Sequence, residues 1–295
     1  MTESLAATLK IVLLTILALC AFAANSILAR LALTATEIDP VSFTGVRLVS
    51  GALMLWLIVR LRQPSTTGNG NWASALALFA YAIAFSLAYL SLTAATGALI
   101  LFGAVQATMV GWALVRGDRL GLGQWIGLAL ALAGLVGLLL PGLHAPPLPA
   151  AGMMLAAGVA WGIYSLRGRG PGDPISTTAT NFALACVPAV AVTVLFLGQS
   201  SWDIPGLLLA IASGALASGL GYVVWYSVLG HIQTSTAAVA QLSVPAITAL
   251  AGVVLLTEPI SLRLLLAGLA ILGGIALVSL GSSSKNLPLA NRKIR

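Results

Sequence analysis

The sequence is divided into long apolar runs, each close to the roughly 20 residues that a helix needs to cross a bilayer. Turn and helix-start residues separate these runs, as at Asp39-Pro40 and Glu258-Pro259. Transmembrane β-strands would give alternating segments of about ten residues, and these runs do not alternate. The pattern predicts an all-α integral membrane protein with ten transmembrane helices, at residues 9–31, 40–61, 72–92, 95–115, 121–141, 147–167, 174–197, 205–229, 233–256 and 261–281.

The composition excludes two other classes of protein. Charged residues make up 7% of the chain and hydrophobic residues 59%, whereas an average soluble domain is about 25% charged. A soluble enzyme of this size needs more polar surface, and a disordered chain is poorer in apolar residues. Cys20 and Cys186 both fall in apolar runs, so we expect them to be small buried side chains.

Lysines and arginines near the helix ends predict the topology, because cytoplasmic loops carry an excess of them. With the N-terminus in the cytoplasm, Arg30 and Arg263 lie outside and Arg47 lies within a span. We therefore expect both termini to be cytoplasmic, and the net charge of +7 requires no nucleic-acid partner. Eleven basic residues then fall inside: Lys10, Arg60, Arg62, Arg116, Arg119, Arg167, Arg169, Lys285, Arg292, Lys293 and Arg295.

The two halves of the sequence resemble each other weakly. Arg47 follows Pro40 by seven residues, as Asn181 follows Pro174, and a Ser lies two residues after each Pro. Further matches occur in the same order, at offsets that run from 134 residues for that Pro pair to 140: Ser26 with Ser165, Tyr89 with Tyr226, Asp118 with Glu258 and Gly134 with Gly274.

Each half holds five predicted helices. Because five is odd, the second half enters the membrane from the opposite side, which makes the repeat inverted. Inverted repeats are typical of secondary transporters, which alternate access to a site near the midplane. We predict a first five-helix repeat at residues 1–141, a second at 147–282 and a basic cytoplasmic tail at 283–295.

A few local features are shared with a known family: the spacing from Pro40 to Arg47, Trp161-Gly162, Pro245 and Thr257-Glu258-Pro259. With these features, residues 9 to 282 resemble the drug/metabolite transporter superfamily, EamA type, and most of all its YddG-type exporters of aromatic amino acids. The resemblance implies export from the cytoplasm across the cell inner membrane. The first half departs from the family pattern, since Asp118 replaces the usual Glu and no Pro matches Pro245.

The placement of the acidic residues limits the cargo. All seven Asp and Glu lie at helix ends or in loops. Carriers that exchange a cation for a proton usually need a carboxylate inside the membrane, so export of organic cations by this route is disfavoured. His144 and His231 fall in different loops, with no acidic or Cys cluster beside them, so we expect no metal. The sequence holds no nucleotide-binding loop or nucleophile motif, so we expect no cofactor and no enzyme activity.

Arg47 is the first candidate for the substrate cavity, because it is the charge that lies well inside a span. It lies seven residues, or about 10 Å, from the helix start at Pro40. It could contact a substrate carboxylate or a gate. Alternatively it is structural, reaching outward or binding carbonyl groups of a neighbouring helix.

Gln241 and Pro245 lie one turn apart in the ninth run, and proline cannot donate to the carbonyl of Gln241. That freed carbonyl could border the cavity or mark a plain kink. Asp118 and Glu258 are interpreted as structural acids that cap the helices starting at 121 and 261. The remaining cavity candidates are polar or aromatic residues inside the spans, which could instead join helices or sit at the interface: Asn25, Tyr81, Gln106, Trp161, Tyr164, Asn181, Tyr222 and Trp225.

These observations predict a secondary transporter that exports small metabolites, most of all aromatic and other neutral amino acids. Aromatic walls with a few amides suit ring stacking, and one Arg without a buried acid suits the carboxylate of a zwitterion. A carrier for another uncharged or zwitterionic solute, such as a purine or a drug, remains the alternative, followed by a channel or membrane scaffold. The expected partners are the solute and the lipid bilayer, with the protein a monomer or weak dimer.

Overall fold

The computed structural model describes residues 2–63, 68–117, 119–142, 145–168, 172–232 and 234–283. Within these ranges every regular element is a helix, and ten helical segments are long and apolar enough to cross a membrane. The predicted all-α membrane fold with ten spans is confirmed. The predicted tail at 283–295 lies outside the described residues after Ser283.

The first five spans are uninterrupted α-helices: α1 (Thr2–Ala35), α2 (Pro40–Arg62), α3 (Trp72–Tyr89), α4 (Ala94–Val115) and α5 (Leu122–Leu139). The second five begin in the same way with α6 (Leu148–Arg167) and α7 (Pro174–Leu195), followed by a short 3-10 turn η1 (Leu197–Gln199). The eighth span is α8 (Ile204–Ile211), a π-helical segment η2 (Ala212–Leu220) and α9 (Gly221–Leu229). The ninth is broken at Leu242 into α10 (Thr234–Gln241) and α11 (Ser243–Leu256), and the tenth is α12 (Leu262–Ser283).

Asp-Pro pairs begin two of the helices. The Asp39 carboxylate accepts hydrogen bonds from the amides of Val41 and Ser42, and Pro40 is the first residue of α2. Asp173 accepts the amide of Ser176 at the start of α7 in the same way. A carboxylate satisfies amides that have no partner in the first turn, and proline loses no hydrogen bond there. These local rules explain why the predicted helix starts agree with the structure.

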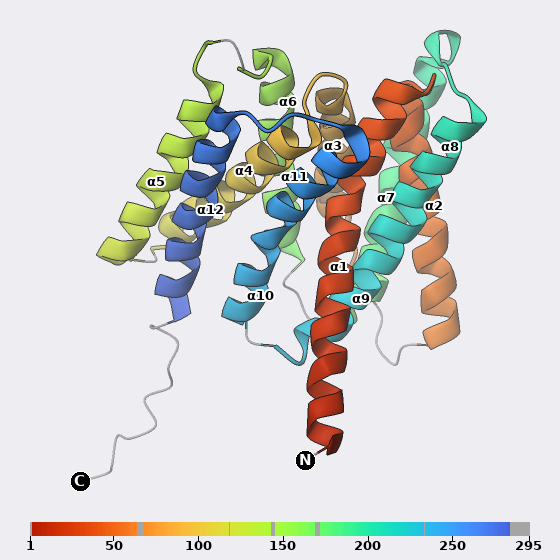
Figure 1. Cartoon of the computed structure of the whole chain (residues 1–295). Coiled ribbons are helices and arrows are strands. Elements are labelled where there is room, and N and C mark those ends of the chain that lie inside the picture. Colours follow the sequence, from red (N-terminus) through yellow and green to blue (C-terminus); the bar gives the residue numbers. More distant parts are fainter. Residues whose placement is uncertain are drawn as a thin grey trace.

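The two halves run in opposite directions through the bundle. In Figure 1, α1 begins at the lower end, next to the marked N-terminus, whereas α6 begins at the upper end. We call the lower side the near face; it carries the connections 62–72, 167–174 and 229–234. The upper side is the far face, with the connections 35–40, 89–94, 195–204 and 256–262.

The fifth and tenth spans pair at one edge of the bundle, where α5 and α12 lie side by side (Figure 1). A Cβ added at Gly127 would meet the Gly274 carbonyl, and one at Gly274 would meet the carbonyl of Gly127. The two backbones therefore touch, as small residues allow in membrane helix pairs.

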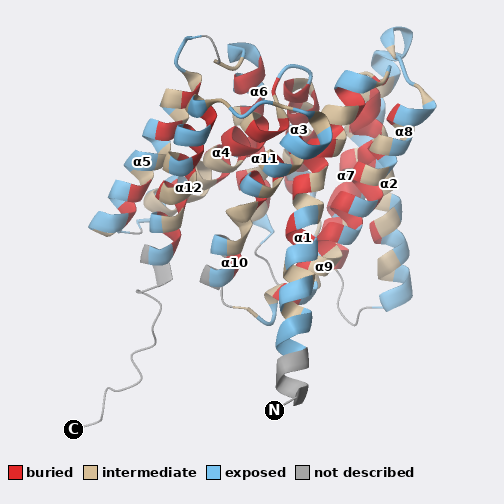
Figure 2. Ribbon diagram, in the orientation of Figure 1, coloured by how far each residue is buried: buried red, intermediate tan, exposed pale blue. Residues whose placement is uncertain are grey.

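The outside of the bundle is apolar. Figure 2 shows the buried positions where helices face one another and exposed positions along the outer helices. Large hydrophobic side chains such as Leu53, Leu122 and Leu250 lie exposed on that surface, as expected for contact with lipid. The prediction for Cys20 is wrong: it is exposed on α1, because an apolar residue in a membrane helix can face lipid as easily as the core. Cys186 is half-buried.

Candidate functional site

Arg47 is buried in the middle of the bundle, with 3% of its surface exposed. Its Nη2 donates to the Tyr81 hydroxyl at 3.0 Å. The guanidinium carbon lies 5.3 Å from the centre of the Tyr81 ring and 4.8 Å from that of Phe85, within the range of cation–π attraction. Arg47 therefore neither reaches outward nor depends on carbonyls of a neighbouring helix for these contacts.

The Nη1 atom of Arg47 is buried and has no hydrogen-bond partner in the described part of the chain. A buried charged donor without an acceptor costs free energy, because water no longer solvates it. Such an atom is where an acceptor group of a bound solute would be stabilised most.

Ten aromatic rings connect to Arg47 in a continuous chain of contacts, which we call the ring cluster. Tyr81 packs on Trp161 with ring centres 4.8 Å apart, and Trp161 stacks on Tyr222 at 5.8 Å with an interplanar angle of 19°. The rings come from α1, α3, α6, α7 and α9, so both repeats contribute. The members are Phe22, Tyr81, Phe85, Tyr89, Trp161, Tyr164, Phe182, Tyr222, Trp225 and Tyr226.

The structure brings the predicted aromatic candidates together. Tyr81, Trp161, Tyr164, Tyr222 and Trp225 all belong to the ring cluster, and all but the half-buried Trp161 are buried. The rings contact one another directly and form one continuous group. Aromatic rings with polar tips can bind a flat apolar group and its polar edge at once.

Asn25 links α1 to the eighth span by hydrogen bonds. Its Oδ1 accepts hydrogen bonds from the hydroxyls of Ser213 at 2.9 Å and Ser218 at 3.1 Å, which join α1 to the π-helical segment η2. Ser218 precedes Tyr222 of α9 by four residues, about one helical turn, and Ser213 precedes it by nine. Asn25 therefore holds the helix that carries Tyr222 and Trp225.

Asn181 belongs to a polar network at the near face. Its Oδ1 accepts the amide of Asn71 at 3.0 Å. Arg167 donates from Nη2 to Asn71 Oδ1 at 3.1 Å and from Nε to Ser74 Oγ at 3.2 Å. This network ties α6 and α7 to the start of α3 at the near face.

The other three predicted cavity residues are not members of the ring cluster: Gln241, Pro245 and Gln106. Gln241 ends α10 just before the break, and the buried Pro245 lies in the first turn of α11. Trp225 shares an apolar cluster with Ala237 and Val244, one on each side of the break. Gln106 borders a crevice on the other side of α4, with residues of α5 and α12.

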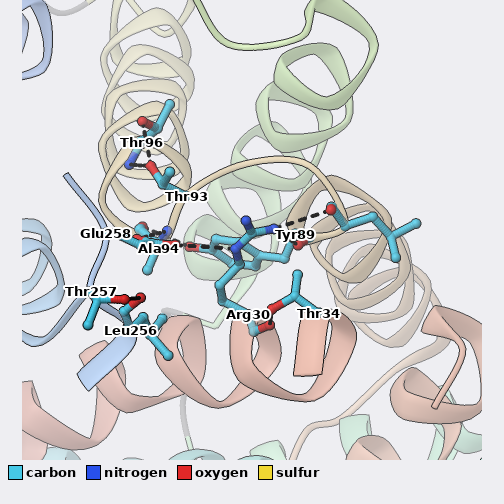
Figure 3. A network of polar contacts seen from close by, with 10 residues as sticks. Arg30, Thr34, Tyr89, Thr93, Ala94, Thr96, Leu256, Thr257 and Glu258 are labelled. Carbon is cyan, nitrogen blue, oxygen red and sulfur yellow. Dashed lines mark hydrogen bonds and ion pairs between the residues drawn. The ribbon is translucent and has the colours of Figure 1, made fainter. Parts of the chain in front are cut away.

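Glu258 takes part in a network at the far face (Figure 3). Its Oε1 accepts from Arg30 Nε at 3.2 Å and its Oε2 from the Ala94 amide at 2.8 Å. The prediction that Glu258 caps the last helix is therefore wrong, because it binds the start of α4 and Ser261 caps α12 instead. Burial raises the pKa of Glu258 above the ordinary value, although the Ala94 amide and Arg30 favour its charged form. The other predicted cap, Asp118, lies outside the described residues.

Sequence reasoning missed part of the site. Phe85 faces Arg47 four residues after Tyr81, a spacing that places both on one helical face and could have identified it. Phe22 and Phe182 gave no signal beyond their apolar surroundings. Arg30 was used only to predict the topology and was not identified as part of a polar network.

Two stretches of the chain, residues 9–140 and 148–280, match the model of the EamA-like transporter family. The chain belongs to this family. The matches correspond to the first and second five spans, so the family unit is repeated. Membership makes the protein a multi-pass membrane transporter rather than an enzyme.

Several relatives support this assignment. The chain is 54% identical over 270 residues to an uncharacterized protein of Pseudomonas aeruginosa, covering 91% of this chain and 94% of the relative. It is 23% identical to the uncharacterized transporter YoaV of Bacillus subtilis, over 81% of this chain and 87% of YoaV. An uncharacterized transporter of Archaeoglobus fulgidus is 25% identical, with 82% and 89% covered. A solved crystal structure at 20% identity shares the fold with a TM-score of 0.63, over 90% of this chain and 97% of that one.

Proposed function

We propose that this transporter exports aromatic amino acids across the inner membrane by alternating access around the ring cluster, with both termini in the cytoplasm. The observation that carries the proposal is the buried, unpartnered Nη1 of Arg47 among aromatic rings. A carboxylate is the acceptor that a guanidinium binds best, through two parallel hydrogen bonds. An aromatic side chain is the group that the neighbouring rings would stack upon.

The ammonium group of such a cargo has partners of a different kind. Among the described residues, no Asp or Glu lies inside the ten membrane segments. The faces of tyrosine and tryptophan rings attract a desolvated cation, and the cluster supplies several. The cargo that fits is therefore a zwitterion or an anion with an aromatic ring, and an organic dication fits poorly.

Uptake into proteoliposomes tests this proposal. We expect wild-type protein to exchange labelled phenylalanine in a saturable way and to be inhibited more by phenylalanine than by phenethylamine, which lacks the carboxylate. Arg47→Gln should lower phenylalanine exchange about 100-fold, the effect of losing roughly 2.7 kcal/mol of charge-assisted hydrogen bonding. The same variant should bind phenylalanine and phenethylamine equally.

Arg263→Gln is the matched control. Arg263 is likewise a hydrogen-bonded arginine, but it donates to the backbone carbonyls of Leu140 and Pro141 at the far face, away from the cluster. We expect its exchange rate to stay near that of the wild type. If Arg47→Gln kept its preference for phenylalanine, the carboxylate would be bound elsewhere and the proposal would fail.

A purine is the second candidate, because the stacked pair Trp161 and Tyr222 would accept any flat heterocycle. Exchange of adenine that survives Arg47→Gln would favour this cargo over an amino acid. Counterflow separates either carrier from a channel, since a channel cannot drive a labelled solute uphill against an unlabelled one.

A further inference from the structure

Arg30, Glu258 and the first amide of α4 form a compact polar group at the far face, which we call the far-face latch (Figure 3). Arg30 also donates from Nη1 to the carbonyls of Tyr89 at 2.9 Å and Leu90 at 3.2 Å. The carboxylate of Glu258 therefore satisfies one guanidinium and one helix start at once. The N-terminus of a helix favours a carboxylate, because its amides lack partners and its dipole is positive there.

The latch joins the two repeats through the Glu258 side chain, which binds the Arg30 side chain and the backbone amide of Ala94. Arg30 and Ala94 belong to the first family match, and Glu258 belongs to the second. The side chains of Arg30 and Glu258 are 20% and 11% exposed, so water reaches their edge. A contact of this kind can break and re-form through small side-chain movements, whereas the close glycine contact between α5 and α12 can part only if whole helices move apart.

The latch lies directly above the ring cluster. Tyr89, whose carbonyl accepts from Arg30, packs its ring on Phe85 with centres 4.7 Å apart, and Phe85 faces Arg47. The Tyr89 hydroxyl donates to the Ala94 carbonyl at 3.3 Å, at the same helix start that Glu258 binds. A Cβ at Gly97 would collide with the Tyr89 ring, so α4 is pressed closely against it. Contacts therefore lead from the candidate binding site to the latch.

We propose that the far-face latch closes the exit over the ring cluster and opens once in each transport cycle, with Glu258 as the group that lets go. Neutralising Glu258 removes the charge that holds Arg30 and weakens the bond to α4, so the far face opens more often. The inference uses the alternating-access part of the proposed function and is independent of the cargo.

Labelling of a buried cysteine measures this opening without any substrate. Ser86 is fully buried on α3, one helical turn before Leu90, whose carbonyl accepts from Arg30, and its hydroxyl accepts from Thr44 of α2. Ser86→Cys is introduced after Cys20 and Cys186 are replaced by alanine, and an impermeant maleimide is added at the far face of sealed vesicles. We expect Glu258→Gln and Arg30→Gln each to raise the labelling rate about tenfold, with no further rise in the double variant, since either change breaks the same contact.

Arg263→Gln serves again as the control and should leave labelling unchanged. Arg30→Lys, which keeps the charge but not the planar fork, gives an intermediate rate and provides a second test if Glu258→Gln is poorly folded. A static brace predicts a different pattern. If labelling stayed at the wild-type rate while the unfolding temperature fell in both variants, the latch would be structural and this inference would be overturned. That result would leave the cargo proposal standing.

Discussion

The helices α2 and α7 begin alike and differ seven residues later. Each starts with a capping Asp, a Pro and a Ser, in equivalent places of the two repeats. The seventh residue after the Pro is Arg47 in α2, which points into the ring cluster, and Asn181 in α7, which binds a near-face loop. The shared start fixes where each helix enters the bundle, whereas the seventh residue after the Pro makes different polar contacts in the two repeats.

The neighbouring spans differ in their backbones as well. In the first repeat α3 and α4 are uninterrupted, whereas their counterparts in the second contain the π-helical η2 and the break at Leu242. Segments of π-helix often occur at functional sites, and η2 lies just before Tyr222 and Trp225. The irregular backbone is thus concentrated in the repeat that supplies most of the rings. The predictions below test whether these differences matter.

Among changes in the second repeat, the largest effect on stability is expected at Gly214 in η2. A Cβ there would collide with the Arg47 carbonyl and the Ser50 hydroxyl, so α2 and η2 depend on this glycine to approach each other. Its counterpart at an offset of 137 is Ala77 in α3, which already carries a Cβ. We expect Gly214→Ala to destabilise the protein by about 1–3 kcal/mol through overpacking, measured as a lower unfolding temperature in detergent.

Gly137→Ala is the matched control, because a Cβ at Gly137 meets nothing within 4 Å. It should be neutral or slightly stabilising, since alanine is the better helix former. Equal stability of both variants would show that η2 can move away from α2, and the close approach would then have no role.

A smaller effect, on transport more than on stability, is expected at Pro245. Pro245→Ala supplies an amide that can donate to the Gln241 carbonyl, which favours one straight helix through the break. We expect uptake to fall about tenfold with a near-normal unfolding temperature, because the packing around Trp225 depends on both sides of the break. The reciprocal change, Val105→Pro in the continuous α4, should cost about 3 kcal/mol of stability. If uptake were unchanged in Pro245→Ala, the break would be a kink without a role in transport.

The smallest effect concerns the capping acids. Burial raises the pKa of Asp39, but hydrogen bonds from Ser42, Ser201 and Val41 outweigh it and hold the pKa below the ordinary value. A lowered pKa contributes stability above the unfolded value of 3.8, and this contribution is lost as the pH falls through the folded value. Asp39→Asn keeps a good cap and removes the titration. We therefore expect the variant to lose less stability than the wild type between pH 5 and pH 3, by under about 1 kcal/mol because the half-buried group is still screened by solvent.

Thermal unfolding across that pH range checks the expectation. The matched variant is Asp173→Asn in α7, which has the same capping role but also loses the ion pair with Arg62 at the near face. If Asp39→Asn lost as much stability at low pH as the wild type, other carboxylates would be responsible for the acid sensitivity.

The sequence predicted what local chemistry determines. Asp-Pro pairs and apolar run lengths gave most helix ends to within a few residues, although α1 begins seven residues before the predicted start, and helical spacing placed Tyr81, Trp161 and Tyr222 on inward faces. It could not predict contacts between distant segments. Glu258 reads as a cap for the helix that follows it, yet the chain turns so that Ala94 and Arg30 are its partners. The sequence also gives no sign of the π-helix. Its contacts are with distant segments: Gly214 packs closely on α2, and two of its serines donate to Asn25 of α1.

The buried guanidinium of Arg47 also has an electrical consequence. A unit charge that moves through the whole membrane field gains or loses about 2.3 kcal/mol per 100 mV. A zwitterion leaves the net charge of the loaded site at +1, whereas an anion reduces it to zero. The voltage dependence of the loaded and unloaded steps would therefore be equal for a zwitterion and different for an anion. Current recorded during net uptake, in which the carrier returns empty, thus reports the charge of the cargo, even when its chemical identity is still open.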